Sequence, residues 1–538
     1  MQVTIEPSIT RHSRGIRMSK RRLNRTGLPV LIALVLGFLG ACASVPDPAS
    51  YEKPASHALT DTQGTRLGQL VREGLGDIAD QSAFYPLVDG MDAFVARMAV
   101  VAAAERSLDV QYYIWHNDTS GVLLVNELLK AADRGVRVRL LLDDLDTAGK
   151  DAFLARFDAH PNIEVRLYNP FGYRGSRGIG FAGDLKRLNH RMHNKSLTAD
   201  NQVTVVGGRN IGNEYFGAVA HTAFQDLDVM GVGPVVGKVS TMFDRYWNSD
   251  VVVPVAAFGL DDGSSDDTLP QARAALEQRA AEYMDSDYVR AIRADGALER
   301  LQLSKMTFLR GRATLLYDSP DKVTATEITA DTHLAPQLAP LFTEARGEVV
   351  IVSPYFVPGE KLVDFFGDLA DKGVRVRIIT NSLAANDVGL VHAGYMRYRE
   401  ALIRRGVEMY EYKPDPSQIT RNKKWIGSSE ASLHAKTMGS GHQRVFVGSF
   451  NLDPRSIALN TEMGILIENE TVATQLHDSF DTMVGRQAYR VELVDGKLRW
   501  TDPGTDGQAI IYDTEPHTTW WQRFAAGTLS LIVPESML

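Results

Sequence analysis

Cysteine is almost absent from this sequence: the chain of 538 residues contains one, Cys42. A single cysteine excludes an intrachain disulfide framework, so this residue needs another explanation. The apolar run near the N-terminus, 28–39, is shorter than the roughly 20 apolar residues of a membrane-crossing helix. An excess of basic residues is lacking as well. The formal net charge of -8 argues against general attraction to nucleic acid and disfavours a nuclease, although a local basic groove is compatible with it.

The length and composition indicate a folded protein with more than one domain. A chain of this length exceeds what one hydrophobic core usually supports. Hydrophobic residues make up 44% and charged residues 23% of the sequence, with a mean hydropathy of -0.16. This balance is typical of globular domains rather than of disordered chains or bundles of membrane helices.

The N-terminal segment has the pattern of a bacterial export signal. Basic residues precede the apolar run, which ends in Leu39-Gly40-Ala41-Cys42. We therefore expect a signal peptide over 1–41, with an uncleaved membrane span and an incidental cysteine as the weaker alternatives. The last four residues resemble the lipobox of bacterial lipoproteins, which implies acylation of Cys42. The prolines that follow predict a flexible tether over 42–64, with order from about residue 65.

An anchor at Cys42 implies a location in the cell envelope. Ala43 follows the cysteine, whereas an acidic residue there would have indicated retention at the inner membrane. By analogy with other lipoproteins, we expect the protein at the periplasmic face of the outer membrane.

An internal duplication organises the rest of the chain. Residues 132–142 and 370–380 match almost residue for residue, and in each copy an amphipathic helix ends at a glycine before an apolar strand. A second strand is expected in each half, over 163–168 and 407–412. The pattern predicts an α/β fold in two halves. We expect a first half over 65–255, a connector with a helical insertion over 256–320, a second half over 321–500, and a C-terminal segment over 501–538.

Two segments lie outside the duplication. Residues 261–267 are rich in Gly, Ser and Asp and predict a loop, and 271–283 predict a polar helix. Near the C-terminus, Trp520 and Trp521 precede the apolar stretch 529–533. This pattern suits a membrane interface, where amphipathic rings lie at headgroup depth, and it suits equally a helix docked on the protein's own core.

Candidate catalytic residues occur twice, in register with the duplication. Both halves carry a His-x-Lys motif, followed seventeen residues after the histidine by an asparagine. Alternate residues of a strand share a face, so each histidine is expected beside its lysine. A lone His-x-Lys is more often a surface strand, but two copies at equivalent positions favour a function. The residues are His193, Lys195, Asp200 and Asn210 in the first copy and His434, Lys436 and Asn451 in the second.

These residue types suit chemistry on a phosphodiester. One histidine acts as the nucleophile, and the other protonates the leaving oxygen and then deprotonates the incoming alcohol or water. The lysines and asparagines stabilise the charge that spreads over the phosphoryl oxygens, and no metal or other cofactor is required. Each imidazole also needs a carboxylate that fixes its tautomer. Glu462 is a candidate for one histidine, and Asp226 or Asp228 for the other.

A third acidic group looks like a metal site at first sight. Asp143, Asp144 and Asp146 follow a predicted strand, where a solvated turn is the more ordinary interpretation. The repeat copy does not preserve these carboxylates, since Asn381 stands at the equivalent place. We therefore expect no metal site there.

The paired motifs resemble the signature of the phospholipase D superfamily over residues 80–500. The stretches 111–115, 191–196, 207–212 and 447–456 are similar to its cardiolipin synthase C branch. The resemblance implies two duplicated α/β domains, each a mixed sheet flanked by helices, related by a pseudo-twofold axis with the active site at their interface. It also implies His193 as the nucleophile and His434 as the acid, although the symmetry of the repeat leaves the reverse order open.

The resemblance implies transfer of a phosphatidyl group, with phospholipids as substrates. Phosphatidylglycerol and phosphatidylethanolamine are the expected lipids, at a membrane surface and without nucleic acid; a protein partner cannot be named. Hydrolysis to phosphatidic acid uses the same residues and is the close alternative. A nuclease of the same superfamily and a catalytically weak lipid-binding lipoprotein are the others.

One position departs from the family pattern. That pattern puts an aspartate seven residues after His434, and this sequence has Gly441 there. The residue is expected in a hairpin turn, away from the face shared by His434 and Lys436. Its loss is therefore expected to affect rigidity more than the chemical groups.

Overall fold

A computed structural model describes residues 45–76, 80–218, 224–260, 269–301, 305–386, 388–414, 433–504 and 508–532. The expected signal peptide, Cys42 and the loop over 261–267 lie outside these ranges. Residues 45–538 form one compact unit. Within the described ranges, no helix has both the length and the apolar character that crossing a bilayer requires.

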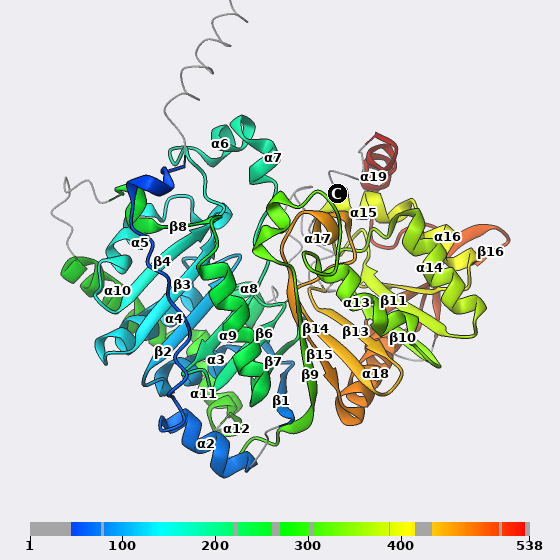
Figure 1. Ribbon diagram of the computed structural model, residues 1–538. Coiled ribbons are helices and arrows are strands. Elements are labelled where there is room, and N and C mark those ends of the chain that lie inside the picture. The colour runs from blue at the N-terminus through cyan, green and yellow to red at the C-terminus, as the bar shows by residue number, and fades with distance from the viewer. Residues whose placement is uncertain are drawn as a thin grey trace, which may run out of the picture. The chain divides into compact units, whose positions relative to one another are not determined.

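The first half is built on a mixed sheet (Figure 1). Its strands lie in the spatial order β1-β7-β6-β5-β2-β3-β4-β8, and the pairs β2–β3 and β3–β4 are parallel. The strand bounds are β1 Ser82–Leu87, β2 Ser107–Tyr112, β3 Arg137–Asp143, β4 Ile163–Tyr168, β5 Ser196–Ala199, β6 Val203–Gly207, β7 Asp228–Val232 and β8 Val252–Pro254.

The second half repeats this order strand for strand. Its sheet runs β9-β15-β14-β13-β10-β11-β12-β16, continues into β17 and β18, and is parallel at β10–β11 and β11–β12. The strand bounds are β9 Leu309–Tyr317, β10 Glu348–Val352, β11 Arg375–Asn381, β12 Glu408–Tyr412, β13 Lys436–Ser440, β14 Arg444–Gly448, β15 Met463–Glu468, β16 Ala488–Val494, β17 Lys497–Asp502 and β18 Ile510–Tyr512.

Helices flank both sheets (Figure 1). Those of the first half are α2 Arg66–Leu75, α3 Gly90–Ala103, α4 Thr119–Asp133, α5 Asp151–Asp158, α6 Arg177–Gly183, α7 Leu185–Leu188, α8 Asn213–Phe216 and α9 Pro234–Trp247, with short 3-10 turns η1 Pro48–Ser50, η2 Asp144–Thr147 and η3 Val255–Phe258. The connector holds α10 Leu269–Met284, α11 Asp287–Asp295 and α12 Ala297–Arg300. The second half has η4 Pro320–Thr324, α13 Leu334–Thr343, α14 Gly359–Asp371, α15 Gly389–Met396, α16 Arg399–Arg404, α17 Pro454–Ala458, α18 Glu470–Arg486 and α19 Trp520–Ile532.

The duplicated helix–glycine–strand unit forms as the sequence predicts. Helix α4 stops before Gly135, which has a φ of 93°, and α14 stops before Gly373, which has a φ of 83°. This left-handed conformation costs glycine little, so the chain turns there into β3 or β11. The predicted fold class, two duplicated α/β domains with mixed sheets, is confirmed.

An apolar cluster joins the two halves. Val206 and Val229 of the first sheet belong to the same buried cluster as Val447, Ile465 and Ile467 of the second. Strand β9 adds backbone pairing, because it is antiparallel to β1 at one end and to β15 along its length. Each half therefore has a core of its own, and this shared cluster holds the two sheets against each other.

Two boundaries differ from expectation. The segment expected to be a flexible tether is fixed from Lys53 onward: the Lys53 ammonium donates to the carbonyl of Ser249 over 2.7 Å, and the buried Arg139 guanidinium donates to the carbonyl of Ser56 over 2.8 Å. Order therefore begins before residue 65, because hydrogen bonds from Lys53 and from the buried Arg139 tie this segment to the first half. In addition, the expected connector contains β9, which is a strand of the second sheet.

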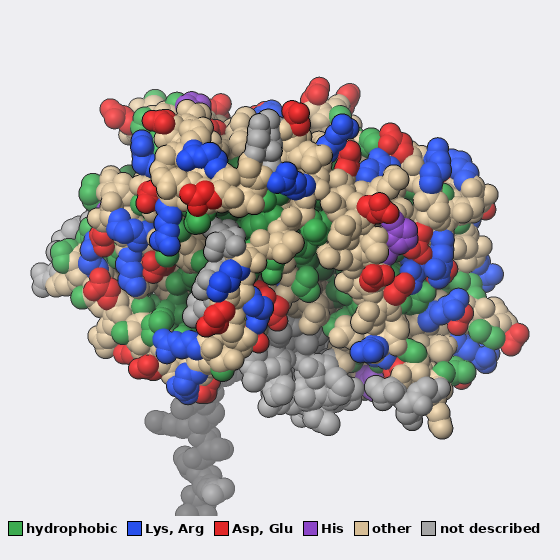
Figure 2. Space-filling model, turned by 90° about the horizontal axis from the view of Figure 1, so that it is seen from below, with side chains coloured by type: hydrophobic (Ala, Val, Ile, Leu, Met, Phe, Trp, Pro, Cys, Tyr) green, Lys and Arg blue, Asp and Glu red, His purple; other side chains and the backbone are tan. Residues whose placement is uncertain are grey.

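Figure 2 shows the face on the side of α2 and α12. Acidic and basic side chains alternate over it, and apolar side chains gather in a hollow near its middle. Neither sign of charge predominates on this face, in keeping with the slightly negative net charge of the whole chain.

Candidate active site

Each candidate histidine is held by the backbone of the opposite half. Met192 pairs with Thr461 in an isolated parallel bridge, and the N–H of His193 donates to the carbonyl of Thr461 over 2.8 Å. The same arrangement recurs where Gln225 pairs with Leu433, and the N–H of His434 donates to the carbonyl of Gln225 over 2.8 Å. These reciprocal contacts bring the two His-x-Lys motifs to one site between the halves.

The imidazole of His193 binds a carboxylate from the second half. Its Nδ1 lies 2.8 Å from Oε2 of Glu462, which is fully buried. Two serine hydroxyls donate to the same carboxylate, Ser449 over 2.5 Å and Ser456 over 2.8 Å. The ring of Tyr113 packs edge-on against the imidazole, with the centroids 5.1 Å apart. Glu462 is therefore positioned to fix the tautomer of His193.

The imidazole of His434 binds a carboxylate from the first half. Its Nδ1 lies 2.6 Å from Oδ2 of Asp226. Tyr215 packs edge-on against the ring and Phe224 stacks on it, with centroids 5.2 Å and 5.1 Å away. Between the two aspartates left open by the sequence, the geometry favours Asp226.

Asp228 is occupied elsewhere. Its carboxylate forms buried ion pairs with Arg97 at 2.9 Å and with Arg209 at 3.2 Å. Arg97 comes from α3, and Arg209 follows Gly208, the first residue after β6. Asp228 therefore ties α3 to the loop that carries Asn210, and it supports the site rather than contacting either histidine.

The two lysines are buried beside their histidines in different ways. Lys195 donates to the carbonyl of His193 over 2.6 Å, and its ammonium lies 5.5 Å from the centre of the Tyr113 ring. Lys436 lies against the His434 ring itself, 3.0 Å from Nδ1 and 3.3 Å from Nε2, and also donates to the carbonyl of His434. Burial lowers the pKa of Lys195 well below its usual value.

Burial dominates the electrostatics of both imidazoles. It lowers the pKa of His193 to about 4 and that of His434 to about 3, and the neighbouring lysines lower both further while Glu462 and Asp226 oppose the shift. Burial alone would raise the pKa of Asp226, but His434 and Lys436 lower it by more. At neutral pH the carboxylates are therefore ionised and the imidazole of His193 is neutral, while Asp226 at Nδ1 stabilises the imidazolium that His434 needs as a proton donor.

The two asparagines are both buried but differ in their partners. Asn210 accepts from the N–H of Ile114 over 3.2 Å and donates to the hydroxyl of Tyr215 over 3.0 Å. Asn451 is 3% exposed, and its Oδ1 has no hydrogen-bond partner among the residues that the structure describes. The side chain of Asn451 can therefore still form a hydrogen bond with a substrate. The side chain of Asn210 already forms hydrogen bonds that hold its own loop.

Asp200 does not join the histidines. It lies beyond Ala199, at the end of β5 away from Lys195, with a φ of 51°. Its carboxylate accepts from the backbone N–H groups of Glu105, Arg106 and Ser107 at 2.7–3.2 Å. Asp200 therefore ties the β5–β6 turn to the start of β2.

The second half anchors the equivalent turn without an aspartate. Gly441 has a φ of 54°, and its N–H donates to the carbonyl of Glu348 over 2.8 Å. The carbonyl of Gly441 contacts Nε2 of His477 at 2.8 Å, and Nδ1 of that ring binds the Glu348 carboxylate at 2.7 Å. A histidine from α18 thus holds the turn at which the sequence departs from the family pattern.

Two of the three aspartates expected in a solvated turn, Asp143 and Asp144, are instead buried. Asp143 accepts from the N–H of Met192 over 2.7 Å and pairs with Arg191, while Asp144 pairs with Arg174 at 3.0 Å. Asp143 thereby holds the residue that precedes His193. The sequence could not reveal this role, because the arginines that neutralise the carboxylates come from a loop far along the chain.

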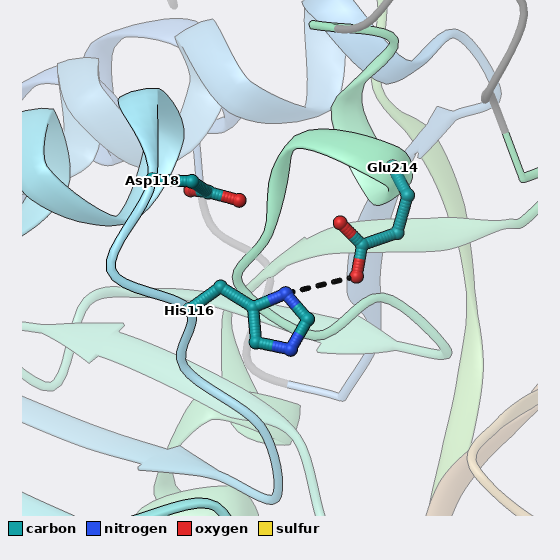
Figure 3. A group of neighbouring side chains, drawn as sticks. All are labelled: His116, Asp118 and Glu214. Atoms are coloured by element: carbon teal, nitrogen blue, oxygen red, sulfur yellow. Dashed lines mark ion pairs between the residues drawn. The ribbon is translucent and has the colours of Figure 1, made fainter. Parts of the chain in front are cut away.

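One other acidic group could hold a cation by distance alone (Figure 3). His116, Asp118 and Glu214 bring one ligand atom each within 4.8 Å of one another, and Nδ1 of His116 pairs with Glu214 at 3.1 Å. Asp118, however, already accepts from the N–H of Gly121 over 3.0 Å and from that of Asn213 over 2.7 Å. The group is therefore explained as the cap of α4 and an ion pair across the loop.

The family described as cardiolipin synthase, PLD-like domain, matches residues 98–247 and 338–484, one segment in each half. The chain belongs to the phospholipase D superfamily, in this cardiolipin synthase group. Cardiolipin synthase C of Escherichia coli K12 is 43% identical over 464 residues, which cover 85% of this chain and 96% of that protein.

More distant relatives share the fold. A cardiolipin synthase of Staphylococcus aureus is 24% identical over 398 residues, covering 73% of this chain and 65% of that protein. The crystal structure of phosphatidylserine synthase from Haemophilus influenzae Rd KW20 superposes with a TM-score of 0.51 at 14% identity, covering 79% of this chain and 92% of that one. The structural likeness supports the fold, and the family match and the 43% identical relative confirm the resemblance inferred from the paired motifs.

Proposed function

We propose that this enzyme transfers a phosphatidyl group from one alcohol to another through a phosphohistidine intermediate. The observation that carries the proposal is the reciprocal pairing of two buried imidazoles with carboxylates of the opposite halves, His193 with Glu462 and His434 with Asp226. With Nδ1 bound to a carboxylate, each imidazole has Nε2 left for the substrate.

In the first step, Nε2 of His193 attacks phosphorus and forms a P–N bond. The P–O bond to the leaving alcohol breaks, and His434 supplies the proton that this alkoxide oxygen takes up. Lys195 donates to the backbone carbonyl of His193, whereas Lys436 lies 3.3 Å from Nε2 of His434. This difference supports His193 as the nucleophile.

In the second step, an acceptor alcohol attacks the phosphohistidine. His434 takes the proton of the acceptor hydroxyl, the new P–O bond forms, and the P–N bond to His193 breaks. The ammonium groups of Lys195 and Lys436 neutralise charge on the phosphoryl oxygens in both steps, and their burial strengthens that attraction.

The acceptor decides between a synthase and a hydrolase. A lipid alcohol as acceptor gives a cardiolipin-like product, and the 43% identity with cardiolipin synthase C supports this outcome. Water as acceptor gives phosphatidic acid by the same first step. We propose phosphatidylglycerol and phosphatidylethanolamine as the lipid pair.

The test is a product assay with the purified full chain and vesicles of phosphatidylglycerol and phosphatidylethanolamine. A doubly phosphorylated lipid product would support the synthase. Phosphatidic acid as the only product would make the enzyme a hydrolase. A labelled donor should leave an acid-labile, base-stable adduct on the wild type, and absence of any adduct would contradict the phosphohistidine route.

We also propose that the protein works at a membrane surface of the cell envelope, anchored through Cys42 at the periplasmic face of the outer membrane. Helix α19 supports contact with lipid: Ala526 is buried toward the fold, whereas Trp520 is 57% and Trp521 70% exposed. Exposed tryptophans of this kind are favoured at the lipid headgroup level.

Two measurements test the anchoring. Labelled palmitate should enter the wild type and not Cys42→Ser, and incorporation in both would place the lipid elsewhere. Protein without residues 1–42 should bind vesicles containing phosphatidylglycerol, and the double substitution of Trp520 and Trp521 by serine should weaken this binding. Unchanged binding would argue against α19 as a contact.

A further inference from the structure

The first half contains a cavity of about 300 Å³ next to the candidate active site. It lies between β3, α4, α5 and the connector helix α10, which Figure 1 shows beside α4 and α5. Its walls are mainly apolar and include Val122 and Val125 of α4, Leu140 and Leu142 of β3, and Phe153 of α5. A cavity of this volume falls in the range of ligand-binding pockets.

One end of the cavity lies next to the catalytic histidine, on the other side of Tyr113. Tyr113 lines the cavity, and its ring contacts the imidazole of His193 at a centroid distance of 5.1 Å. Asp143 also lines it and holds the N–H of Met192, the residue before His193. A molecule that fills the cavity therefore lies one side chain, that of Tyr113, away from the imidazole of His193.

The polar groups at the cavity already have protein partners. Lys150 pairs with Asp146 at 2.6 Å and donates to the carbonyl of Trp115 over 2.7 Å. Arg279 donates to Asn117 over 3.0 Å. With these groups satisfied, the remaining lining selects for an apolar occupant.

Helix α10 closes the cavity with one face. Ala272, Ala275, Leu276 and Arg279 line it, and their spacing of three and four residues places them on one stripe of the helix. The ion pair of Arg273 with Asp133 of α4, at 2.8 Å, fixes the helix in place. Small alanine side chains on this stripe leave the space open.

We infer that this cavity binds one acyl chain of the phosphatidyl donor, an inference that rests on the proposed function. The diacylglycerol part stays attached to phosphorus throughout the phosphohistidine stage, while the leaving and accepting alcohols exchange. A pocket that starts beside the nucleophile and is lined by aliphatic side chains holds the part of the substrate that stays.

The test fills the cavity from α10. Ala272→Phe puts a ring into the space, and Ala274→Phe is the matched control, because Ala274 is exposed on the other side of the same helix. We expect Ala272→Phe to lower kcat/KM for dioleoyl-phosphatidylglycerol by about tenfold relative to the dihexanoyl lipid, since each methylene kept out of an apolar pocket costs binding. The control should keep the wild-type ratio.

Other outcomes of this assay overturn the inference. An unchanged ratio in Ala272→Phe excludes the cavity as the acyl site. An equal loss on both lipids shows that the substitution acts through the fold, and so does the same change of ratio in Ala274→Phe. Val125→Phe, which fills the cavity from α4, should reproduce the effect of Ala272→Phe, and failure to do so contradicts the inference.

A binding measurement separates this inference from the proposed function. In a His193→Ala background, phosphatidylglycerol with a parinaroyl chain should accept fluorescence energy from tryptophan, because Trp115 lines the cavity. Adding Ala272→Phe should weaken this binding by about tenfold and adding Ala274→Phe should not. Binding that depends on Ala272 without turnover of any phospholipid would retain the pocket and reject the proposed reaction. Binding insensitive to Ala272 would reject the pocket.

Discussion

The half of the site around His193 and the half around His434 share their backbone geometry but not their side chains. Both imidazoles follow a parallel bridge to the opposite half and bind a carboxylate from it. Around His193 the carboxylate is a glutamate that receives two serine hydroxyls, whereas around His434 it is an aspartate, and a lysine lies against the ring. The duplicated fold thus supplies equal positions, and the side chains make the two histidines unequal.

The residues Gly208 and Ser449 show how this inequality arises. They occupy equivalent positions, directly after the glycine that ends β6 or β14. A Cβ atom at Gly208 would lie 2.2 Å from Oδ1 of Asp226, so the aspartate needs glycine there. At Ser449 the side chain instead donates to Glu462. A single position therefore makes room for one carboxylate and binds the other.

Substitution of either histidine is expected to have the largest effect on activity. His193→Ala and His434→Ala should each lower kcat/KM by at least about 10⁴-fold for a phospholipid donor, because neither nucleophile nor acid can be replaced by water. The two variants should differ with a phosphodiester whose leaving group is p-nitrophenolate, which needs no acid. His434→Ala should still form a phosphohistidine and His193→Ala should not, as measured by adduct mass after base quenching. An adduct in His193→Ala and none in His434→Ala would reverse the two roles.

Substitution of the carboxylates that each half contributes to the histidine of the other is expected to have the next largest effect. Glu462→Gln and Asp226→Asn should each reduce kcat/KM by about 10²- to 10⁴-fold, because an amide no longer fixes the tautomer or balances the imidazolium. The measurement is steady-state transfer, with thermal unfolding as the control for folding. Activity that survives both substitutions would show that the reciprocal pairing is structural.

Exchanging the small residues tests the difference between the halves directly. Gly208→Ser should displace Asp226 and lower kcat by about 100-fold, whereas Ser449→Gly removes one hydrogen bond and should lower it by about tenfold. Both are measured on the same phospholipid donor. Equal effects would contradict the steric account of Gly208.

The sequence predicted the fold and the meeting of the two histidine motifs, because the fold and the motifs are both duplicated. The repeated helix–glycine–strand unit specified the order of the sheets, and the two His-x-Lys motifs lie where that repeat places them. Which carboxylate of the opposite half binds each histidine was only partly predictable. Asp226 and Asp228 alternate along the chain, and what separates them is the pair Arg97 and Arg209, which only the folded chain brings to Asp228.

Other features had no signal in the sequence. The cavity beside Tyr113 depends on the way the connector helix α10 closes over α4. In the sequence, the four residues of α10 that line the cavity look like one face of an ordinary helix. The anchor of Gly441 comes from His477, which lies 36 residues further along the chain. Such contacts depend on tertiary packing, so neither periodicity nor motif spacing reports them.

The pH dependence of adduct formation should reflect burial of His193. Its pKa is about 4, so the imidazole is neutral and nucleophilic above that pH. Below that pH the ring is protonated and can no longer attack phosphorus. With the p-nitrophenyl substrate, kcat/KM should stay level from pH 7 to about 4 and then fall about tenfold per pH unit. A midpoint near the ordinary imidazole value of about 6.5 would show that the free site is hydrated and unlike the buried geometry.

The smallest expected change in rate concerns the two hairpin turns, β5–β6 at Asp200 and β13–β14 at Gly441, which lie at the ends of these strands away from the site. Asp200→Ala should lower the free energy of unfolding by about 2–4 kcal/mol, because it leaves three backbone donors without their carboxylate, and it should change kcat/KM by less than about threefold. His477→Ala should act the same way on the second turn, and urea unfolding measures both.

Restoring the family's aspartate with Gly441→Asp is the converse test. The backbone there has a φ of 54°, which an aspartate tolerates at a cost of about 1 kcal/mol, and His477 already binds the turn. We therefore expect no gain in kcat/KM. A tenfold gain would mean that the aspartate acts on the chemistry and that the two turns are not equivalent anchors. An unchanged rate would leave the rigidity of the hairpin as the property that both halves share, reached by a carboxylate in one and an imidazole in the other.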